Sequence, residues 1–104
     1  MKKIGLLGGT FDPPHYGHLI IANEAMTQCQ LDEVWFIPTY VPPHKQGLKV
    51  TKPEHRVNMV KLAIASHSSF RLCMIEIERK GPSYTYDTIK KLRESYDDVH
   101  FYFI

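Results

Sequence analysis

A chain of 104 residues with 43% hydrophobic and 12% aromatic side chains is long and apolar enough for one folded domain, which argues against disorder. Its formal net charge of +2, from 13 basic and 11 acidic residues, is too balanced for nucleic-acid binding and favours a small-molecule partner. No apolar stretch approaches the roughly 20 residues that cross a bilayer, and Cys29 and Cys73 form no CxxC pair. We therefore expect a cytoplasmic chain with reduced thiols and no membrane segment.

The first half of the chain predicts two strands around one helix. Lys3–Leu7 is a short apolar run typical of a buried strand, and the glycines and prolines that follow it force a loop before a helix over Gly17–Gln28. Val34–Ile37 is predicted to be the second strand. The segment Pro38–Gly47 carries three prolines and a glycine, so we expect it to be an exposed, functional loop.

The second half predicts two further helices and two strands. Thr51 and Glu54 have the spacing of a capping box, ahead of a helix from about Pro53 to Ala65. Phe70–Glu78 alternates like a strand, and Gly81, Pro82 and Ser83 end it, with Ser83 able to cap the third helix. The expected buried face of the second helix is Val57, Val60 and Ile64, and that of the third is Tyr86, Ile89, Leu92 and Tyr96. The run Val99–Ile104 is expected to be the last strand.

This alternation predicts an α/β fold in which a mostly parallel sheet is covered by helices. We expect one domain over 1–104. In such sheets ligands bind beyond the carboxyl ends of the strands, so the loops after Leu7, Ile37 and Glu78 are expected to share one crevice.

The first of these loops has the composition of a phosphate site. Gly8 and Gly9 precede a helix start near Gly17, and a helix start directs backbone N–H groups and a positive dipole end at an anion. The loop matches neither G-x-G-x-x-G nor G-x-x-x-x-G-K-[ST]. Instead it carries His15 and His18, which are three residues apart and can face one ligand.

Other interpretations of these residues remain open. His15 and His18 have the chemistry of zinc ligands, although no third ligand has a matching spacing. Asp12, which precedes two prolines, is interpreted as a turn former, and we assign no metal ligand. The remaining simple interpretations are a solvated loop position for His44 and Lys45, a helix start for Thr85, a core position for Trp35, and surface positions for His55 and Arg56.

Three blocks of the sequence resemble a known family. They are Gly8 to Leu19, Pro38 with Pro42-Pro43-His44-Lys45, and Gly81-Pro82-Ser83-Tyr84-Thr85-Tyr86-Asp87-Thr88, with His55-Arg56 and Met59 between the last two. The first block, with its His-x-Gly-His segment, resembles the signature of the nucleotidyltransferase superfamily. The other two, in this order, resemble the bacterial nicotinate mononucleotide adenylyltransferases.

The resemblance implies a Rossmann-like fold and adenylyl transfer from ATP to nicotinate mononucleotide, which gives deamido-NAD and pyrophosphate in NAD biosynthesis. It implies Mg²⁺ accompanying ATP, with the substrates as partners and a possible homo-oligomer. It makes His18 and His15 the catalytic residues. By resemblance, the ATP phosphates would be bound by Gly8, Gly9, Thr10, Phe11, His15, Gly17, His18, His44 and Lys45, and nicotinate mononucleotide by Thr39, Lys45, Tyr84 and Thr85.

The chain departs from the family at two points. Thr39 stands where many members carry asparagine, which bears on the acceptor-side contact. Family members are also longer, and their second half supplies a Gly-Ala-Asp-like turn, a Trp-Tyr pair and an arginine that holds ATP, so the domain is expected to be incomplete after Ile104. Two alternatives follow: a sister enzyme that uses phosphopantetheine, the amide mononucleotide or CTP, and an inactive nucleotide-binding fragment.

Overall fold

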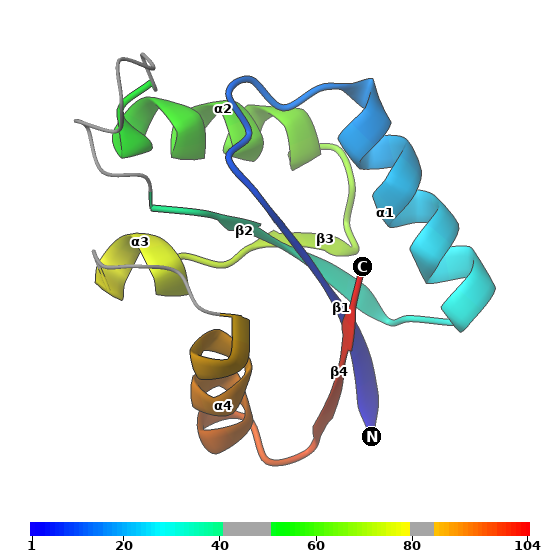
Figure 1. The fold of residues 1–104 in the computed structure, drawn as a ribbon. Helices are drawn as coiled ribbons and strands as arrows, with labels where there is room; N and C mark the ends of the chain where they lie inside the picture. The colour runs from blue at the N-terminus through cyan, green and yellow to red at the C-terminus, as the bar shows by residue number, and fades with distance from the viewer. Residues whose placement is uncertain (41–50, 80–84) are drawn as a thin grey trace.

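The computed structural model describes residues 1–40, 51–79 and 85–104, in which each strand but the last is followed by one or two helices (Figure 1). The elements are β1 (Lys2–Gly9), α1 (Tyr16–Cys29), β2 (Glu33–Pro38), α2 (Pro53–Ile64), β3 (Phe70–Leu72), α3 (Ile75–Arg79), α4 (Thr85–Ser95) and β4 (Val99–Phe103). No helix within these ranges is long and apolar enough to cross a membrane.

The four strands form one parallel sheet in the order β3-β2-β1-β4. The register pairs Leu6 of β1 with Trp35 on one side and with Phe103 on the other. The chain therefore moves outward from β1 to β2 and β3, and then crosses back to place β4 on the free side of β1. The predicted α/β class is confirmed, and the reversal of strand order lies between β1 and β4, where such sheets bind ligands.

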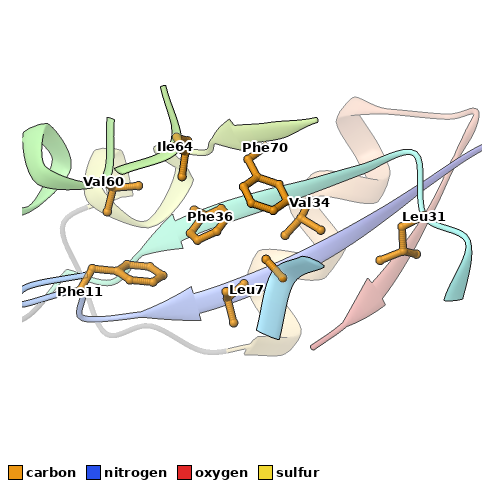
Figure 2. Close-up of a cluster of buried hydrophobic side chains, with 9 residues drawn as sticks. Leu7, Phe11, Leu31, Val34, Phe36, Val60, Ile64 and Phe70 are labelled. Atoms are coloured by element: carbon orange, nitrogen blue, oxygen red, sulfur yellow. The ribbon is translucent and has the colours of Figure 1, made fainter. Parts of the chain in front are cut away.

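Each face of the sheet has its own apolar core because neighbouring residues of a strand point to opposite faces. On one face Leu7, Val34 and Phe36 pack with Val60 and other side chains from α1 and α2 (Figure 2). On the other face Ile4, Leu6 and Ile37 pack with Leu92 of α4 and with half-buried side chains that include Ile75, Ile89 and Trp35. Helices α1 and α2 thus cover one face, and α3 and α4 cover the other (Figure 1).

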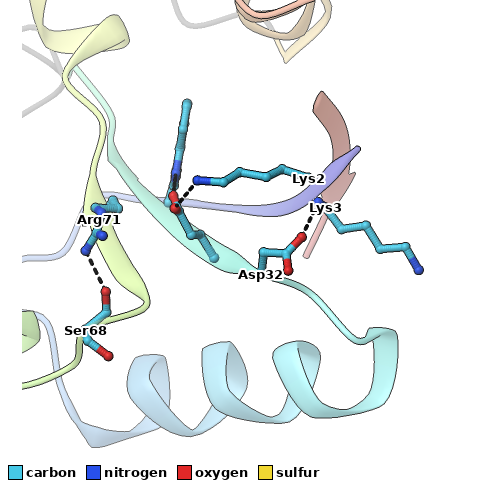
Figure 3. A network of polar contacts seen from close by, with 7 residues as sticks. Lys2, Lys3, Asp32, Ser68 and Arg71 are labelled. Atoms are coloured by element: carbon cyan, nitrogen blue, oxygen red, sulfur yellow. Dashed lines mark hydrogen bonds and ion pairs between the residues drawn. The ribbon is translucent and has the colours of Figure 1, made fainter. Parts of the chain in front are cut away.

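Charged side chains lie together at the amino-terminal ends of β1 and β2 (Figure 3). Lys2 forms an ion pair with Glu33 at 3.1 Å, and the backbone N–H of Lys3 donates to Asp32 at 2.8 Å. Glu33 also accepts a bond from the Trp35 indole N–H at 2.8 Å, and that bond is the main cause that lowers the pKa of Glu33. These contacts help to hold β1 in register with β2, and all of them lie away from the carboxyl-terminal ends of the strands.

The prediction of one strand over Phe70–Glu78 is wrong. The strand β3 ends at Leu72, and the last bond of that ladder runs from the Cys73 N–H to the Phe36 carbonyl. The chain then turns into α3, in which Ile75 packs into the second core and the Glu76 carboxylate is buried. The alternation of apolar and acidic residues in this segment is equally compatible with a single helical turn, and tertiary packing decides between them.

The predicted buried stripe of α4 is only half correct. Leu92 is buried and Ile89 is half-buried, but Tyr86 is 74% exposed and Tyr96 is 46% exposed. Thr88 is buried as well, and its hydroxyl forms hydrogen bonds with the side chains of Glu76 and Arg79 in α3. Ser83, the predicted cap, lies outside the described residues.

The predicted capping box at the start of α2 is also wrong. The N-cap is Lys52, which makes no side-chain capping bond within the described residues, and Pro53 occupies the first turn. Thr51 instead uses its backbone groups: its N–H donates to Asp12 at 2.9 Å and its carbonyl accepts from Arg56 at 2.9 Å. The residues predicted to form the buried face of this helix, Val57, Val60 and Ile64, are buried as expected.

Candidate functional site

A cavity of about 290 Å³ lies at the carboxyl-terminal edge of the sheet. Its polar lining comes from the end of β1, from the residue after β2, and from α3 and α4, namely Gly8, Gly9, Thr10, Thr39, Glu76 and Thr88. The Thr39 N–H donates to the Gly9 carbonyl at 2.9 Å, which keeps the ends of β1 and β2 together. Thr10 and Thr39, which directly follow the first two strands, thus line one cavity. The prediction that the loops after Leu7, Ile37 and Glu78 share one crevice extends to segments 41–50 and 80–84, which lie outside the described residues.

The loop after β1 ends in a reciprocal cap made by two histidines. His15 is the N-cap of α1, and its Nδ1 accepts a bond from the Gly17 N–H at 3.0 Å. In return the His15 N–H donates to Nδ1 of His18 at 3.0 Å. The two rings lie with their centroids 4.0 Å apart and their planes inclined by 34°. The spacing of three residues does bring both imidazoles to one place, as the sequence predicted.

This cap fixes which ring nitrogen can face a ligand. A backbone N–H can only donate, so each Nδ1 must be unprotonated while the cap is intact. In a neutral imidazole the proton then resides on Nε2, which is the nitrogen left for an outside partner. His15 and His18 therefore present two N–H donors at the start of α1, where the helix dipole also favours an anion.

Gly17 is required by the same arrangement. A Cβ built at Gly17 would lie 2.7 Å from Cε1 and 2.9 Å from Nδ1 of His15, closer than real Cβ contacts allow. Any larger residue would push the His15 ring away from the N–H that it caps. The glycine between the two histidines thus serves the side-chain geometry of His15.

His18 rests on the apolar core through Phe11. The two rings contact edge to face with centroids 4.8 Å apart, and Phe11 in turn packs on Phe36. Partial burial, and to a lesser extent the neighbouring His15, lower the pKa of His18 below its ordinary value of 6.5. The lowered pKa favours the neutral ring that the cap requires. Phe11 is only 2% exposed, so its side chain supports the site from beneath.

The structure places only part of the predicted site. The residues Gly8, Gly9, Thr10 and Thr39 line the cavity. His15, Gly17 and His18 form the cap at the start of α1, and neither histidine is among the residues that line the cavity. His44, Lys45 and Tyr84 lie outside the described residues. Thr85 is the first residue of α4. Asp12 accepts the Thr51 N–H, as suits a turn residue, and Thr51, through its side chain and then its backbone, lowers the pKa of Asp12.

Three buried polar residues next to the site were missed by sequence reasoning. Arg56, interpreted as a surface residue, is fully buried and bonds to the Thr10 carbonyl. Its spacing of four and eight residues from Val60 and Ile64 is the signal that places it on the buried face. Glu76 and Thr88 are also buried and share a 3.0 Å bond, and no pattern in the sequence indicated that pair.

Other features of the described residues lie apart from the histidines. A larger cavity of about 550 Å³ lies between α3 and α4, and Trp35, Cys73 and Lys91 are among the residues that line it. Both cysteines are free, as predicted, and burial raises the pKa of the Cys73 thiol. No group of three His, Cys, Asp or Glu side chains in the described ranges is placed to hold a metal ion.

Comparison with known proteins shows the family to which this fold belongs. Residues 6–103 match the family described as cytidylyltransferase-like, and the chain belongs to that family. The chain is 56% identical over all its 104 residues to a Bacillus cereus protein called probable nicotinate-nucleotide adenylyltransferase, and 58% identical to a Bacillus cytotoxicus protein of the same description. It spans about half of these relatives, 55% of their length.

Solved structures show the same arrangement of elements. The nicotinic acid mononucleotide adenylyltransferase of Plasmodium falciparum, complexed with NaAD, superposes with a TM-score of 0.76 at 25% identity, over 99% of this chain and 51% of that one. A putative nicotinate-nucleotide adenylyltransferase of Vibrio parahaemolyticus gives a TM-score of 0.78 at 24% identity, over 99% and 56% of the two chains. The predicted Rossmann-like nucleotidyltransferase fold is thereby confirmed.

Proposed function

We propose that this chain is the nucleotide-binding part of an enzyme that transfers an adenylyl group from ATP to nicotinate mononucleotide, giving deamido-NAD and pyrophosphate in the cytoplasm. The observation that carries the proposal is the histidine cap at the start of α1, in a chain that is 56% identical to a probable nicotinate-nucleotide adenylyltransferase. A phosphate oxygen of the acceptor attacks the α-phosphorus, and the bond from that phosphorus to the bridging oxygen of pyrophosphate breaks.

The acceptor is already an anionic nucleophile, so the site must position phosphates and stabilise charge. His15 and His18 fit this need because their Nε2–H donors are set by the cap before any ligand binds. We assign His18 to the charge that develops on the α-phosphate and the departing pyrophosphate. His15, Gly8, Gly9 and Thr10 would bind the rest of the phosphate chain.

Mg²⁺ is the metal that this chemistry implies. Its preferred ligands are hard oxygens, and the phosphates of ATP supply them, so the described residues need not form a cage of their own. When bound to ATP, Mg²⁺ neutralises part of the phosphate charge. The protein groups that would bind the phosphate oxygens are then the two imidazoles and backbone N–H donors. By resemblance, His44 and Lys45 would bind them as well.

The acceptor side of the proposal depends on α4. A helix start binds a carboxylate through its free N–H groups, and Thr85 begins α4 three residues before Thr88, which lines the cavity. We therefore assign Tyr84 and Thr85 to the nicotinate carboxylate, with Thr39 and Lys45 nearer the acceptor phosphate. This choice favours the acid over the amide mononucleotide.

The test is pyrophosphate release with ATP, Mg²⁺ and nicotinate mononucleotide, beside the amide form, phosphopantetheine and CTP. It is run with this chain and with a chain extended to the length of its relatives. We expect release with the nicotinate form, its loss in His18→Ala, and its retention in His100→Ala, which removes an exposed imidazole near the amino-terminal end of β4. Turnover with another acceptor, or an unaffected His18→Ala variant, would contradict the assignment.

A further inference from the structure

Arg56 is a fully buried arginine on the first turn of α2, with 0% of its surface exposed. A guanidinium ion in the interior is costly unless its N–H groups are bonded, because desolvation disfavours the charge. Here Nε donates to the Thr51 carbonyl at 2.9 Å and Nη1 donates to the Thr10 carbonyl at 2.8 Å, while the buried Nη2 has no partner among the described residues. Arg56 therefore joins two segments that are far apart in the sequence.

The Thr10 carbonyl belongs to the peptide that precedes Phe11, which is a strained position. Phe11 has a φ of 51°, in the left-handed region that a bulky residue rarely adopts, so its surroundings must hold it there. The Arg56 bond fixes the orientation of the peptide between Thr10 and Phe11. The Phe11 ring then meets His18 edge to face at 4.8 Å.

A second contact holds the same loop from its other side. The Asp12 carboxylate accepts the Thr51 N–H at 2.9 Å, while the Thr51 carbonyl accepts from Arg56. The peptide groups on both sides of Thr51 are thus anchored to the loop or to the arginine. Asp12 is exposed, whereas Arg56 is buried, so the arginine is the part of this arrangement that solvent cannot replace.

We propose that Arg56 is a positioning residue of the phosphate site: through the Thr10 carbonyl and Phe11 it sets the place of His18, without touching the ligand itself. This inference rests on the proposed function only for the identity of the ligand. The coupling from Arg56 to His18 is a property of the free protein. It can therefore be tested even if the chain binds no nucleotide.

The experiment follows the imidazole signals of His18 by NMR through a pH titration, in the original chain and in Arg56→Met. Loss of the Thr10 contact releases Phe11, so we expect the pKa of His18 to rise toward its ordinary value as its ring becomes more solvated. Arg56→Lys keeps the charge but cannot donate to both carbonyls, and should give a smaller rise. Arg71→Met, a change of the same kind at an exposed arginine bonded to Ser68, should leave His18 unmoved.

A folded Arg56→Met protein with an unchanged His18 titration would overturn the proposal. If neither Arg56 variant folds, the original chain decides without any ligand: an Arg56 Nε–H signal that shifts together with the His18 ring signals through the pH titration supports the proposal, and an Arg56 signal that stays unmoved while His18 titrates refutes it. Affinity for tripolyphosphate, which we expect to weaken severalfold in Arg56→Met, is measured in parallel. Failure of the original chain to bind it would count against the proposed function and not against the coupling.

Discussion

Helices α1 and α2 cover the same face of the sheet, yet their first turns are satisfied in opposite ways. The start of α1 is closed by its own side chains, because His15 and His18 each accept a backbone N–H. The start of α2 has a lysine at the N-cap position that makes no such bond within the described residues. There a buried Arg56 reaches out of the helix to bond the loop after β1.

The difference shows two ways in which one loop is held rigid. The cap of α1 is local and uses exposed groups, so it fixes the tautomers of the imidazoles at little cost in buried polarity. The contact from α2 is long-range and buried, so it contributes more to stability and depends on the whole domain being folded. Variants at the two helix starts should therefore differ in size and in sign.

The largest expected effect is that of Arg56→Met on the free energy of unfolding. Two partly buried hydrogen bonds to the carbonyls of Thr10 and Thr51 are lost, and each such loss costs about 1–3 kcal/mol, so we expect a decrease of about 2–6 kcal/mol. The measurement is urea denaturation followed by circular dichroism. The matched variant Arg71→Met should stay within about 0.5 kcal/mol of the original chain. Equal decreases in the free energy of unfolding at both sites would contradict the special role of the Arg56 contacts.

Gly17→Ala should lower stability at a helix position where alanine normally raises it. Helix propensity alone predicts a gain of up to about 1 kcal/mol. The new Cβ would displace His15, however, and loss of a cap costs about 1 kcal/mol with the added strain of the contact. We expect a net decrease of about 0.5–1 kcal/mol. Asn23→Ala, at an exposed position of the same helix, should raise stability by a few tenths, and a gain at both positions would contradict the role of Gly17.

Lys52→Asp should raise stability, because it supplies the side-chain cap that α2 lacks within the described residues. An aspartate at an N-cap is worth about 0.5–1 kcal/mol over a residue that cannot accept a bond. Thermal unfolding measures the change. Glu54→Ala should cost only a few tenths, since Glu54 takes no part in a capping box; a loss near 1 kcal/mol would restore the sequence-based prediction.

The smallest expected effect is the pH dependence that His18 contributes. Its pKa is lower in the folded state than its ordinary 6.5, so the unfolded chain binds more protons in this range. The contribution is therefore complete above 6.5 and is lost as pH falls through the folded pKa. His18→Gln keeps an acceptor for the His15 N–H but does not titrate. The stability difference between the two chains should shift in favour of His18→Gln on acidification, and a constant difference would refute the lowered pKa.

Much of the fold could be predicted from the sequence, because strand and helix periods in α1, α2, β1 and β2 agree with their flanking glycines and prolines. The predicted bounds of these elements fall within two residues of those observed. The errors occur where packing decides the outcome. Residues 70–78 have alternation that suits a strand, yet Glu76 is buried against Thr88 and the chain turns helical.

The sequence predicted only those parts of the site whose residues lie close together along the chain. His15, Gly17 and His18 lie within one turn, so their spacing was sufficient to bring them together. Arg56 acts on Thr10 across 46 positions of the sequence, and a distance of that kind is set by tertiary packing. The simple rule that arginine is a surface residue therefore gave the wrong interpretation.

The central claim is that His15 and His18 offer Nε2–H donors to a nucleotide phosphate. The most direct test is ¹⁵N NMR of the histidine side chains near neutral pH, with and without ATP and Mg²⁺. We predict that both rings are unprotonated at Nδ1 in the free chain, and that both Nε2–H signals shift when ATP is added while those of His67 and His100 do not. Protonated Nδ1 atoms in the free chain, or Nε2–H signals that do not shift when ATP binds, would contradict this claim.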